Sequence, residues 1–467
     1  MSGPSSGREA SGRLVVVSNR LGDPSRPAKG GLAVALNGAL NELGGIWMGW
    51  SGETTTGEVS DADRLDVRDT GKVLIAGVDI DAADYAGYYE GYANSVLWPL
   101  FHGRQDLMEP QPDYLAAYGR VNALFARQLA GLIRPDDTVW VHDYHLIPLA
   151  EELRKLGVEN RIGFFLHIPM PPSQLMAAVP GHEALIRNLF HYDLVGFQTH
   201  ADVVNFSLYT QRVLAMEPQE AGPLRAFGRE MHARAFPIGI DVDQFRDLLL
   251  TEESRELVSR VGSTTAGRNL IAGVDRLDYS KGLPERLRVF ERLLEKYPEN
   301  DRQTTLVQIA SPTRENVEAY ADIRDELDRL SGHVNGRFAT IDWTPIRYIF
   351  RHVERARLAG LYSISKVGLV TPLRDGMNLV AKEFVAVQDD DDPGVLVLSE
   401  FAGAAEEMTE ALLVNPHDIE STADTVQRAL TMPLAERRER HRVLRERVER
   451  GDVVAWSRAF LDALAAI

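Results

Sequence analysis

The second half of the sequence carries cations where they could neutralise a diphosphate. An apolar run at 270–274 leads into a loop that contains Arg276 and Lys281, five residues apart. Another apolar run, at 306–310, is followed within a few residues by Arg314. Guanidinium and ammonium groups suit a diphosphate, which bears charge on several oxygens. Each cation alone is typical of an exposed loop, but together they predict a site for a phosphorylated ligand.

A third segment of the same kind combines a helix start with two carboxylates. The apolar run at 367–370 leads through a loop to a helical pattern that begins near Leu379. The first N–H groups of a helix favour phosphate. Asp375 can hold sugar hydroxyls from the loop, and Glu383, inside the helix, can accept hydrogen bonds from ribose hydroxyls. Stability alone does not readily explain such groups after strands in both halves of the chain.

The first half offers weaker signals of the same chemistry. Arg20 follows the apolar run at 14–18 and could clamp a phosphate, although surface arginines are common. Gly30 and Gly31 precede a helical pattern. Paired glycines at such a place either let the backbone approach a phosphate or form a tight turn, so both interpretations stay open.

The stretch HDYH at 142–145 ends another apolar run. Its histidines and aspartate resemble metal ligands, but further ligands have no evident source and a strand end would not align the pair. We therefore predict that Asp143 accepts hydrogen bonds from sugar hydroxyls and that both histidines are structural. His167 follows the next run, and the proline-rich exit at 169–172 aims it at the ligand. A satisfied histidine at a strand end is the alternative.

Asp241 and Asp243 imitate two other known motifs. The spacing matches the metal-binding DxD motif of one class of glycosyltransferases and the start of a haloacid-dehalogenase phosphatase site. The pair directly follows the strand-like segment PIGI at 237–240, where one domain gives way to the next. This place favours chance spacing, with a helix-capping role, over either motif.

Short apolar strands must position these residues. The runs are 14–18, 139–142, 163–167, 194–197, 270–274, 306–310, 367–370, 395–398 and 412–414. Near-continuous hydrophobic strands separated by helices predict parallel sheets covered on both faces, and so many strands predict two sheets. In such sheets ligands bind beyond the carboxyl ends of the strands, which is where the candidate residues lie.

The last two helical segments differ in character. Residues 434–450 are crowded with arginine and glutamate, which predicts a solvated helix face rather than a binding patch. Trp456, Phe460 and Leu464 then repeat at intervals of four and form an apolar stripe. This stripe predicts a terminal helix that packs on a core.

Composition limits the classes of function. A chain of 467 residues suits two domains, and a net charge of −17 argues against nucleic-acid binding, which needs clustered positive charge. No apolar run reaches the roughly 20 residues that span a bilayer, and the first 12 residues lack the apolar core of a signal peptide. The absence of cysteine excludes disulfides and thiolate metal sites. We expect a cytoplasmic protein without nucleic-acid or membrane partners.

Several longer segments together resemble the bacterial trehalose-6-phosphate synthases, a family of retaining glucosyltransferases, from about residue 13 to the C-terminus. They are VVVSNR (15–20), KGGLAV (29–34), YYEGYANSVLWPLFH (88–102), VHDYHLIP (141–148), RIGFFLHIPMP (161–171), DRLDYSKGLPER (275–286), TPLRDGMNLVAKE (371–383) and SEFAGAA (399–405). The resemblance implies the α/β fold called GT-B, with two Rossmann-like, doubly wound parallel-sheet domains facing a deep cleft. The expected bounds are 13–243, joined by the terminal helix 452–467, and 244–451.

The resemblance also implies roles for individual residues. The acceptor glucose-6-phosphate would be bound by Arg20, Tyr89, Trp98, Asp143 and Arg314. The donor, a nucleoside-diphosphate glucose, would be bound by Gly30, Gly31, His167, Arg276, Lys281, Val353, Asp375, Leu379, Val380, Ala381, Lys382 and Glu383. Catalysis would rest on Asp143, His167, Arg276 and Lys281.

The implied reaction gives trehalose-6-phosphate and a nucleoside diphosphate with retention of configuration. Arg276 and Lys281 would stabilise the leaving diphosphate, so no metal and no cofactor is expected. No carboxylate is an obvious covalent nucleophile, and the family's mechanism is a front-face displacement. The base would lie near Val353, where relatives often carry an aromatic residue. UDP-glucose is the expected donor, and this departure at Val353 leaves GDP-glucose open.

Two other functions are compatible with the same fold. A pseudo-glycosyltransferase would couple cyclitol-type substrates through nitrogen, but the glucose-contact set at Asp143, His167 and Asp375 disfavours it. A catalytically silent sugar-phosphate sensor would tolerate loss of the phosphate-binding cations, which are all present here. Product formation from a nucleotide-glucose distinguishes these alternatives. A homo-oligomer, dimer or tetramer, is also compatible with the sequence.

Overall fold

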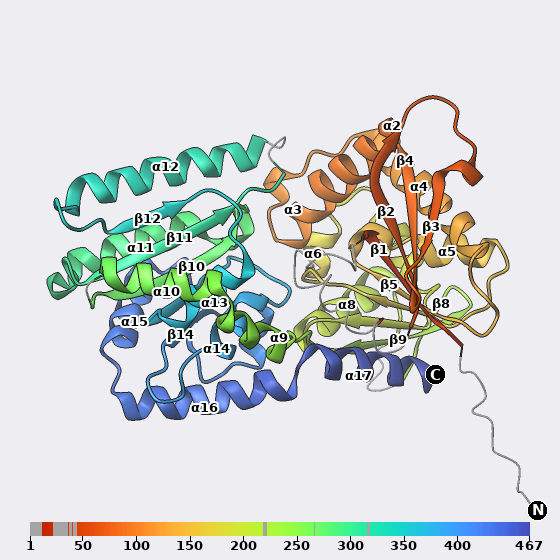
Figure 1. Cartoon of the computed structure of the whole chain (residues 1–467). Helices are drawn as coiled ribbons and strands as arrows, with labels where there is room; N and C mark the ends of the chain where they lie inside the picture. The colour runs from red at the N-terminus through yellow and green to blue at the C-terminus, as the bar shows by residue number, and fades with distance from the viewer. Residues whose placement is uncertain are drawn as a thin grey trace, which may run out of the picture. The chain divides into compact units, whose positions relative to one another are not determined.

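The computed structural model describes residues 12–21, 36, 40, 44–217, 222–265, 267–314 and 318–467 (Figure 1). Gly30 and Gly31 lie outside these residues. The chain divides into two compact units, Met1–Phe236 with Ser457–Ile467 and Pro237–Trp456. Both are α/β units built on a mainly parallel sheet. The predicted change of domain at 243–244 falls a few residues after the division between Phe236 and Pro237.

Among the residues that the structure describes, the sheet of the first unit has nine strands in the order β3-β4-β2-β1-β5-β6-β7-β9-β8. Their bounds are β1 Leu14–Arg20, β2 Gly45–Thr55, β3 Leu65–Asp69, β4 Val73–Asp81, β5 Thr138–His142, β6 Ile162–Phe165, β7 Leu194–Phe197, β8 Leu224–Ala226 and β9 Arg229–Ala235. Only the edge strands β3 and β8 pair antiparallel with their neighbours; the strands between them pair parallel. The order reverses between β1 and β5, and such a switch point is where doubly wound sheets bind ligands.

Helices connect these strands. They are η1 Asp61–Arg64, α2 Ala82–Tyr85, η2 Ala86–Leu97, α3 Trp98–Phe101, η3 Gln105–Leu107, α4 Pro112–Ala130, η4 Tyr144–Leu146, α5 Leu149–Lys155, α6 Ser173–Met176, α7 His182–Leu189 and α8 His200–Val213. The C-terminal α17, Val453–Ala465, carries the predicted stripe, whose three members are buried. Phe460 stacks on Trp140 of β5 with ring centroids 4.7 Å apart, which confirms that the stripe packs on a core.

Over its described segments, the sheet of the second unit has six strands, all parallel, in the order β12-β11-β10-β13-β14-β15. Their bounds are β10 Asn269–Arg276, β11 Thr304–Ser311, β12 Ile346–Ile349, β13 Val367–Val370, β14 Val395–Ser399 and β15 Leu412–Val414. Alternate residues of β13 show that both faces are covered. Val367 and Leu369 join the main apolar core, whereas Gly368 lies against the ring of Phe384.

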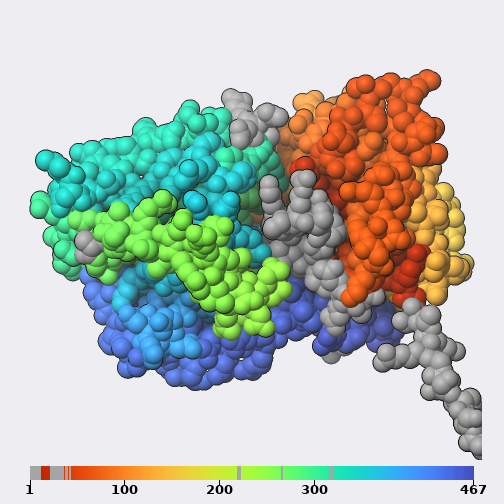
Figure 2. Space-filling view, in the orientation of Figure 1, coloured from red at the N-terminus to blue at the C-terminus, as the bar shows by residue number. Residues whose placement is uncertain are grey.

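The helices of this unit form two packed groups. The first contains α11 Leu283–Lys296, α12 Glu318–Phe338 and α15 Ile419–Thr431. The second contains α9 Val242–Asp247, α10 Glu252–Thr265, α13 Arg355–Ser363, α14 Leu379–Ala386 and α16 Leu434–Arg450. Short 3-10 turns are η5 Leu248–Leu250, η6 Tyr279–Lys281, η7 Pro298–Asn300 and η8 Gly403–Glu406. Figure 2 shows α10, in light green, at the surface of this unit.

Two sequence predictions about helices have structural outcomes. Asp241 caps α9, where its side chain accepts a hydrogen bond of 3.0 Å from the backbone N–H of Gln244, so the capping role is confirmed. The predicted solvated face of α16 is present, with Arg438, Glu439 and Arg442 exposed. The opposite stripe is buried and includes Arg437 and His441, and Arg437 pairs there with Asp392 at 2.6 Å.

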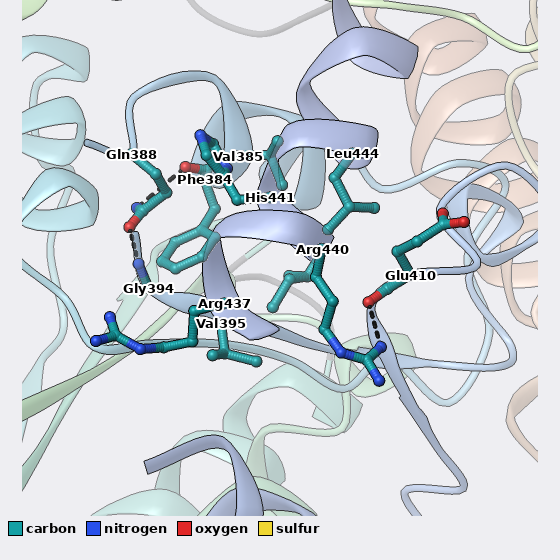
Figure 3. Close-up of a pocket in the computed structure, with 11 residues that line it drawn as sticks. Phe384, Val385, Gln388, Gly394, Val395, Glu410, Arg437, Arg440, His441 and Leu444 are labelled. Atoms are coloured by element: carbon teal, nitrogen blue, oxygen red, sulfur yellow. Dashed lines mark hydrogen bonds between the residues drawn. The ribbon is translucent and has the colours of Figure 1, made fainter. Parts of the chain in front are cut away.

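A small pocket lies where α14 meets α16 (Figure 3). It is lined by Phe384, Val385, Gln388, Gly394, Val395, Leu396, Glu410, Arg437, Arg440, His441 and Leu444. None of the predicted ligand-binding residues is among them. Within the described part of the chain, no helix is long and apolar enough to cross a membrane.

Candidate active site

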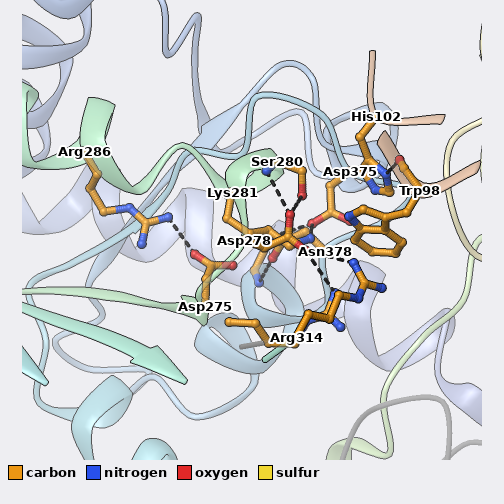
Figure 4. Close-up of polar contacts among 12 residues, drawn as sticks. Trp98, His102, Asp275, Asp278, Ser280, Lys281, Arg286, Arg314, Asp375 and Asn378 are labelled. Carbon is orange, nitrogen blue, oxygen red and sulfur yellow. Dashed lines mark hydrogen bonds and ion pairs between the residues drawn. The ribbon is translucent and has the colours of Figure 1, made fainter. Parts of the chain in front are cut away.

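In the second unit, Lys281 and Asp375 come together from separate loops. Lys281 Nζ lies 2.6 Å from Asp375 Oδ2, and Asn378 donates to the same oxygen at 3.1 Å (Figure 4). The lysine follows β10 and the other two follow β13, which is the neighbouring strand. The Lys281 side chain is only 8% exposed, so the carboxylate holds its charge in a fixed place. The sequence predicted both residues but not their contact.

Asp278 is a buried anchor for two of the predicted cations. Its carboxylate lies 3.9 Å from Arg276 and 3.8 Å from Arg314, and its side chain has no exposed surface. The other carboxylate oxygen accepts from the backbone N–H and the hydroxyl of Ser280, at 3.0 and 2.9 Å. Arg314 also donates to the Tyr320 hydroxyl at 2.6 Å. The structure thus brings a predicted donor cation and a predicted acceptor cation to one carboxylate.

Arg286 of α11 links the strands that carry these loops. It donates to Asp275 at 2.7 Å, Thr371 at 3.1 Å and Gln308 at 3.2 Å, and so it joins β10, β11 and the end of β13. Burial raises the pKa of Asp275, and the guanidinium acts in the opposite direction. Sequence reasoning missed this residue. The available signal was an arginine on the apolar stripe of α11, beside Leu287.

The start of α14 is shaped as a phosphate-binding helix end would be. Asn378 adopts φ 76° and its side chain accepts from the backbone N–H of Ala381. Leu379 and Val380 form the first turn with Ala381. Lys382 points into the unit instead, since its Nζ lies 2.8 Å from the Ile238 carbonyl and 2.7 Å from Glu407. Lys382 can therefore meet a donor only through its backbone.

Glu383 lies on the same helix and pairs with Arg355 at 3.3 Å. Burial raises the pKa of Glu383, and Arg355 opposes that shift. Val353, the predicted neighbour of the base, lies two residues before Arg355 in the segment that leads into α13. The ribose and base predictions therefore concern two adjoining elements, α13 and α14, which pack together.

In the first unit, Arg20 lies beside a row of aromatic rings. Its guanidinium carbon is 5.3 Å from the ring centroid of Trp50. Trp50 contacts Tyr85 at 4.6 Å, Tyr85 stacks on Tyr89 at 5.3 Å, and Tyr89 stacks on His145 at 5.7 Å between centroids. A cation and a hydroxyl group are thereby placed along one apolar wall, as a sugar phosphate requires.

The helix that carries Tyr89 is wound more widely than an α-helix. η2 is a π-helix of 12 residues, and such winding is rare and frequent at functional sites. Asn94 of η2 and Trp98, which begins the following helix α3, both contact Tyr144. The Tyr144 hydroxyl donates to Asn94 at 3.0 Å, and its ring centroid is 5.9 Å from that of Trp98. A sequence pattern read with a period of 3.6 does not reveal this arrangement.

Asp143 has a strained backbone and is tied to His167 on the next strand. Its φ of 76° and ψ of 164° belong to a region that is nearly exclusive to glycine, and strain of this kind clusters at active sites. The Asp143 carboxylate accepts from the backbone N–H of His167 at 3.2 Å, and the rings of His142 and His167 share a hydrogen bond of 3.1 Å. Burial lowers the pKa of His167 to about 3 and that of His142 well below its usual value, so both rings are neutral.

Each unit thus groups most of its predicted residues. Around the ends of β1, β5 and β6 lie Arg20, Tyr89, Trp98, Asp143 and His167. Around the ends of β10, β11 and β13 lie Arg276, Lys281, Arg314 and Asp375, followed by α14 with Glu383. Among the described residues, no three His, Asp or Glu side chains form a group that could hold a metal ion.

Comparison with known proteins identifies the family. The model of glycosyltransferase family 20 matches residues 17–466. A trehalose-6-phosphate synthase of Sinorhizobium fredii is 49% identical over 459 residues, which cover 97% of this chain and 98% of that protein. The chain belongs to glycosyltransferase family 20.

Solved structures of other members agree over the whole fold. A UDP-forming trehalose-phosphate synthase from Burkholderia xenovorans, in complex with glucose-6-phosphate, is 49% identical with a TM-score of 0.92 and covers 97% of this chain and 100% of its own. An E. coli structure bound with UDP-2-fluoro glucose is 44% identical with a TM-score of 0.92 and covers 97% and 99%. The two parallel-sheet α/β units are consistent with the GT-B fold predicted from the sequence.

Proposed function

We propose that this chain is a trehalose-6-phosphate synthase, which transfers glucose with retention from a nucleoside-diphosphate glucose to glucose-6-phosphate. The observation that carries the proposal is the network of cations held by carboxylates at the strand ends of the second unit: Lys281 on Asp375, and Arg276 with Arg314 on Asp278. Relatives that cover 97% of the chain have been solved with glucose-6-phosphate and with UDP-2-fluoro glucose.

The chemistry follows from charge. As the bond from the anomeric carbon to the diphosphate breaks, the sugar becomes positive and the leaving oxygen becomes negative. Arg276 and Lys281 stabilise that oxygen, and the first N–H groups of α14 do the same. The acceptor hydroxyl attacks the same face and passes its proton to the departing diphosphate, so the products are trehalose-6-phosphate and the nucleoside diphosphate. Catalysis in this scheme is positioning and charge stabilisation, without metal or cofactor.

The first unit supplies groups for the acceptor and for the transferred glucose. Arg20 and Tyr89 address the acceptor phosphate, and Trp98 shapes the pocket around the sugar. Asp143 accepts from sugar hydroxyls. His167 contacts the transferred glucose as a neutral hydrogen-bonding group, since burial disfavours the second proton that would charge its ring.

UDP-glucose is the proposed donor, with GDP-glucose second. Similar solved structures are described as UDP-forming, but the aliphatic Val353 stands where the base is expected. We also propose that the enzyme works in the cytoplasm, on phosphorylated small molecules and without nucleic acid or a membrane. A dimer or tetramer is compatible with this role.

An assay of product formation tests the function. Glucose-6-phosphate is supplied with UDP-, GDP- or ADP-glucose, and trehalose-6-phosphate and nucleoside diphosphate are measured in equal amounts. A parallel reaction with excess EDTA should run at the same rate, because the cations replace a metal. Loss of activity on chelation, restored by magnesium or manganese, would contradict the metal-free mechanism. Binding of both substrates without product would favour a silent sensor, and use of a cyclitol acceptor a pseudo-glycosyltransferase.

A further inference from the structure

The ion pair between Arg355 and Glu383 links two elements of the second unit. Arg355 Nη2 lies 3.3 Å from Glu383 Oε1, and the two side chains are 26% and 13% exposed. Arg355 is the first residue of α13, and Glu383 lies on α14. No role for this arginine came from the sequence, although it lies two residues after Val353.

The stability of α13 does not explain Arg355. The N-terminus of a helix carries partial positive charge, so a cation in the first turn is unfavourable there. The guanidinium is nevertheless fixed by three neighbours. It donates to Gln244 at 3.3 Å, lies over the ring of Phe245 at 5.1 Å from its centroid, and pairs with Glu383. These contacts direct the charge at Glu383 rather than toward solvent.

Among the described residues, Arg355 is the cation that acts on Glu383. Burial raises the pKa of Glu383, and Arg355 lowers it. From the same helix as Arg355, Tyr362 faces this region as a neutral phenol, because burial raises its pKa well above the usual value. Lys382 is held by Glu407, and α9 contributes Arg246, which bonds the carbonyl of Ala386.

We propose that Arg355 is a positioning residue that keeps Glu383 ionised and directed so that it accepts hydrogen bonds from the ribose of the nucleotide donor. This role rests on the proposed function, in which Glu383 meets that ribose. The ion pair uses Oε1, and a carboxylate has a second oxygen and further lone pairs for hydroxyl donors. Bonds from hydroxyls to a charged oxygen are about twice as strong as bonds to a neutral one.

The test measures nucleotide binding by calorimetry with UDP and with 2′,3′-dideoxy-UDP. Arg355→Met keeps the length of the side chain and its packing on Phe245 but removes the charge. It should weaken UDP binding about 10-fold at pH 7, as expected for loss of a charged hydrogen bond. Binding of the dideoxy nucleotide should not change, because it has no ribose hydroxyls to lose. Equal weakening of both nucleotides, or of neither, would overturn the proposal.

The pH dependence adds a result that a merely structural arginine would not give. Without Arg355 the pKa of Glu383 should rise further, so the group is ionised only at higher pH. UDP binding by Arg355→Met should therefore recover between pH 7 and 9, whereas wild type should show no such recovery. Arg355→Lys should restore much of the affinity at pH 7. If the UDP affinity of Arg355→Met stays low at every pH in this range, Arg355 acts through packing alone and the proposal fails.

Two further controls separate the possible failures. Glu383→Gln should resemble Arg355→Met, and the double variant should be no weaker than either single variant. Binding does not require glucosyl transfer. If wild type discriminates the two nucleotides as expected but forms no trehalose-6-phosphate, the proposed function fails and the role of Arg355 stands. If wild type forms the product but binds both nucleotides equally, the role of Arg355 fails and the function stands.

Discussion

The two units place their ligand residues at the same point of the fold, beyond the carboxyl ends of parallel strands, but they use different chemistry there. In the first unit the predicted residues contact rings and neutral histidines: Tyr89 stacks on His145, and His167 shares a hydrogen bond with His142. In the second unit, Lys281 and Arg314 are largely buried and lie close to carboxylates.

This difference follows from what each ligand does during the reaction. A diphosphate gains negative charge as it leaves, so the cations that meet it must be held before the reaction starts. Buried carboxylates can hold them, because a buried cation without a partner is costly. A sugar ring stays uncharged until the bond breaks, and rings and neutral imidazoles can shape its pocket. The predictions below test whether the ion pairs of the second unit and the ring contacts of the first act independently.

The largest effect is expected from Lys281→Ala. The cation meets charge that grows in the transition state, so kcat should fall about 10²-fold, as for loss of one preorganised donor. The donor KM should change less. Lys281→Arg should rescue only part of the rate, because it keeps the charge but changes its geometry. Steady-state kinetics with varied nucleotide-glucose provide the test, and an unchanged kcat with a raised donor KM would restrict Lys281 to docking.

Arg314→Ala should act on the acceptor instead. Loss of a charged hydrogen bond of ~1.5–3 kcal/mol should raise the KM for glucose-6-phosphate at least about 10-fold. Nucleotide affinity measured by calorimetry should stay nearly unchanged. The matched variant is Arg276→Ala, which should show the reverse pattern. A collapse of nucleotide affinity in Arg314→Ala, with an unaltered acceptor KM, would show that the assignment is wrong.

Asp278→Asn should produce a smaller effect on both substrates at once. The substitution keeps the shape but removes the charge that lies near Arg276 and Arg314. Both arginines lose a partner, so the donor and acceptor KM should each rise about 2-fold to 5-fold, as expected for loss of one weak ion pair. Ser280→Ala removes a neutral bond to the same carboxylate and is the control. A change in only one KM would mean that Asp278 serves a single cation.

The smallest effect is expected from pH acting on the first unit. The pKa of His167 is lowered to about 3, so its ring stays neutral from pH 5.5 to 8 and kcat/KM should show no histidine limb there. Stability should behave differently. Histidine in the unfolded chain takes up a proton near pH 6.5, whereas the buried ring does not, so the free energy of unfolding should fall as pH drops below about 6.5.

Urea unfolding between pH 5.5 and 7.5 measures that slope. His142→Asn offers a similarly placed hydrogen-bonding group and removes one buried histidine, so its slope should be shallower than that of wild type. A histidine limb in the activity profile that disappears in His142→Asn would show that the pair titrates during catalysis. The contrast between neutral histidines in the first unit and ion pairs in the second would then fail.

The class of fold and most of the candidate residues could be predicted from the sequence. Short apolar runs with helices between them require parallel sheets covered on both faces, and cations after such runs must gather at one edge of a sheet. The resemblance to the family then assigned ligand-binding roles to residues such as Tyr89 and Trp98, which composition and spacing do not single out. These features depend on local sequence, because burial and strand direction impose a pattern on neighbouring residues.

The residues that hold the ligand-binding side chains in place could be identified only from the folded structure. Asp278 lies close to two cations, Arg286 joins three strands, and Arg355 pairs with Glu383. Most of these partners lie far apart in the sequence, and Arg286 stands in an ordinary amphipathic helix pattern. The π-helical winding of η2 and the strained Asp143 belong to the same class. A single sequence does not encode such contacts as a readable pattern, because they depend on the register of strands and helices that meet only after folding.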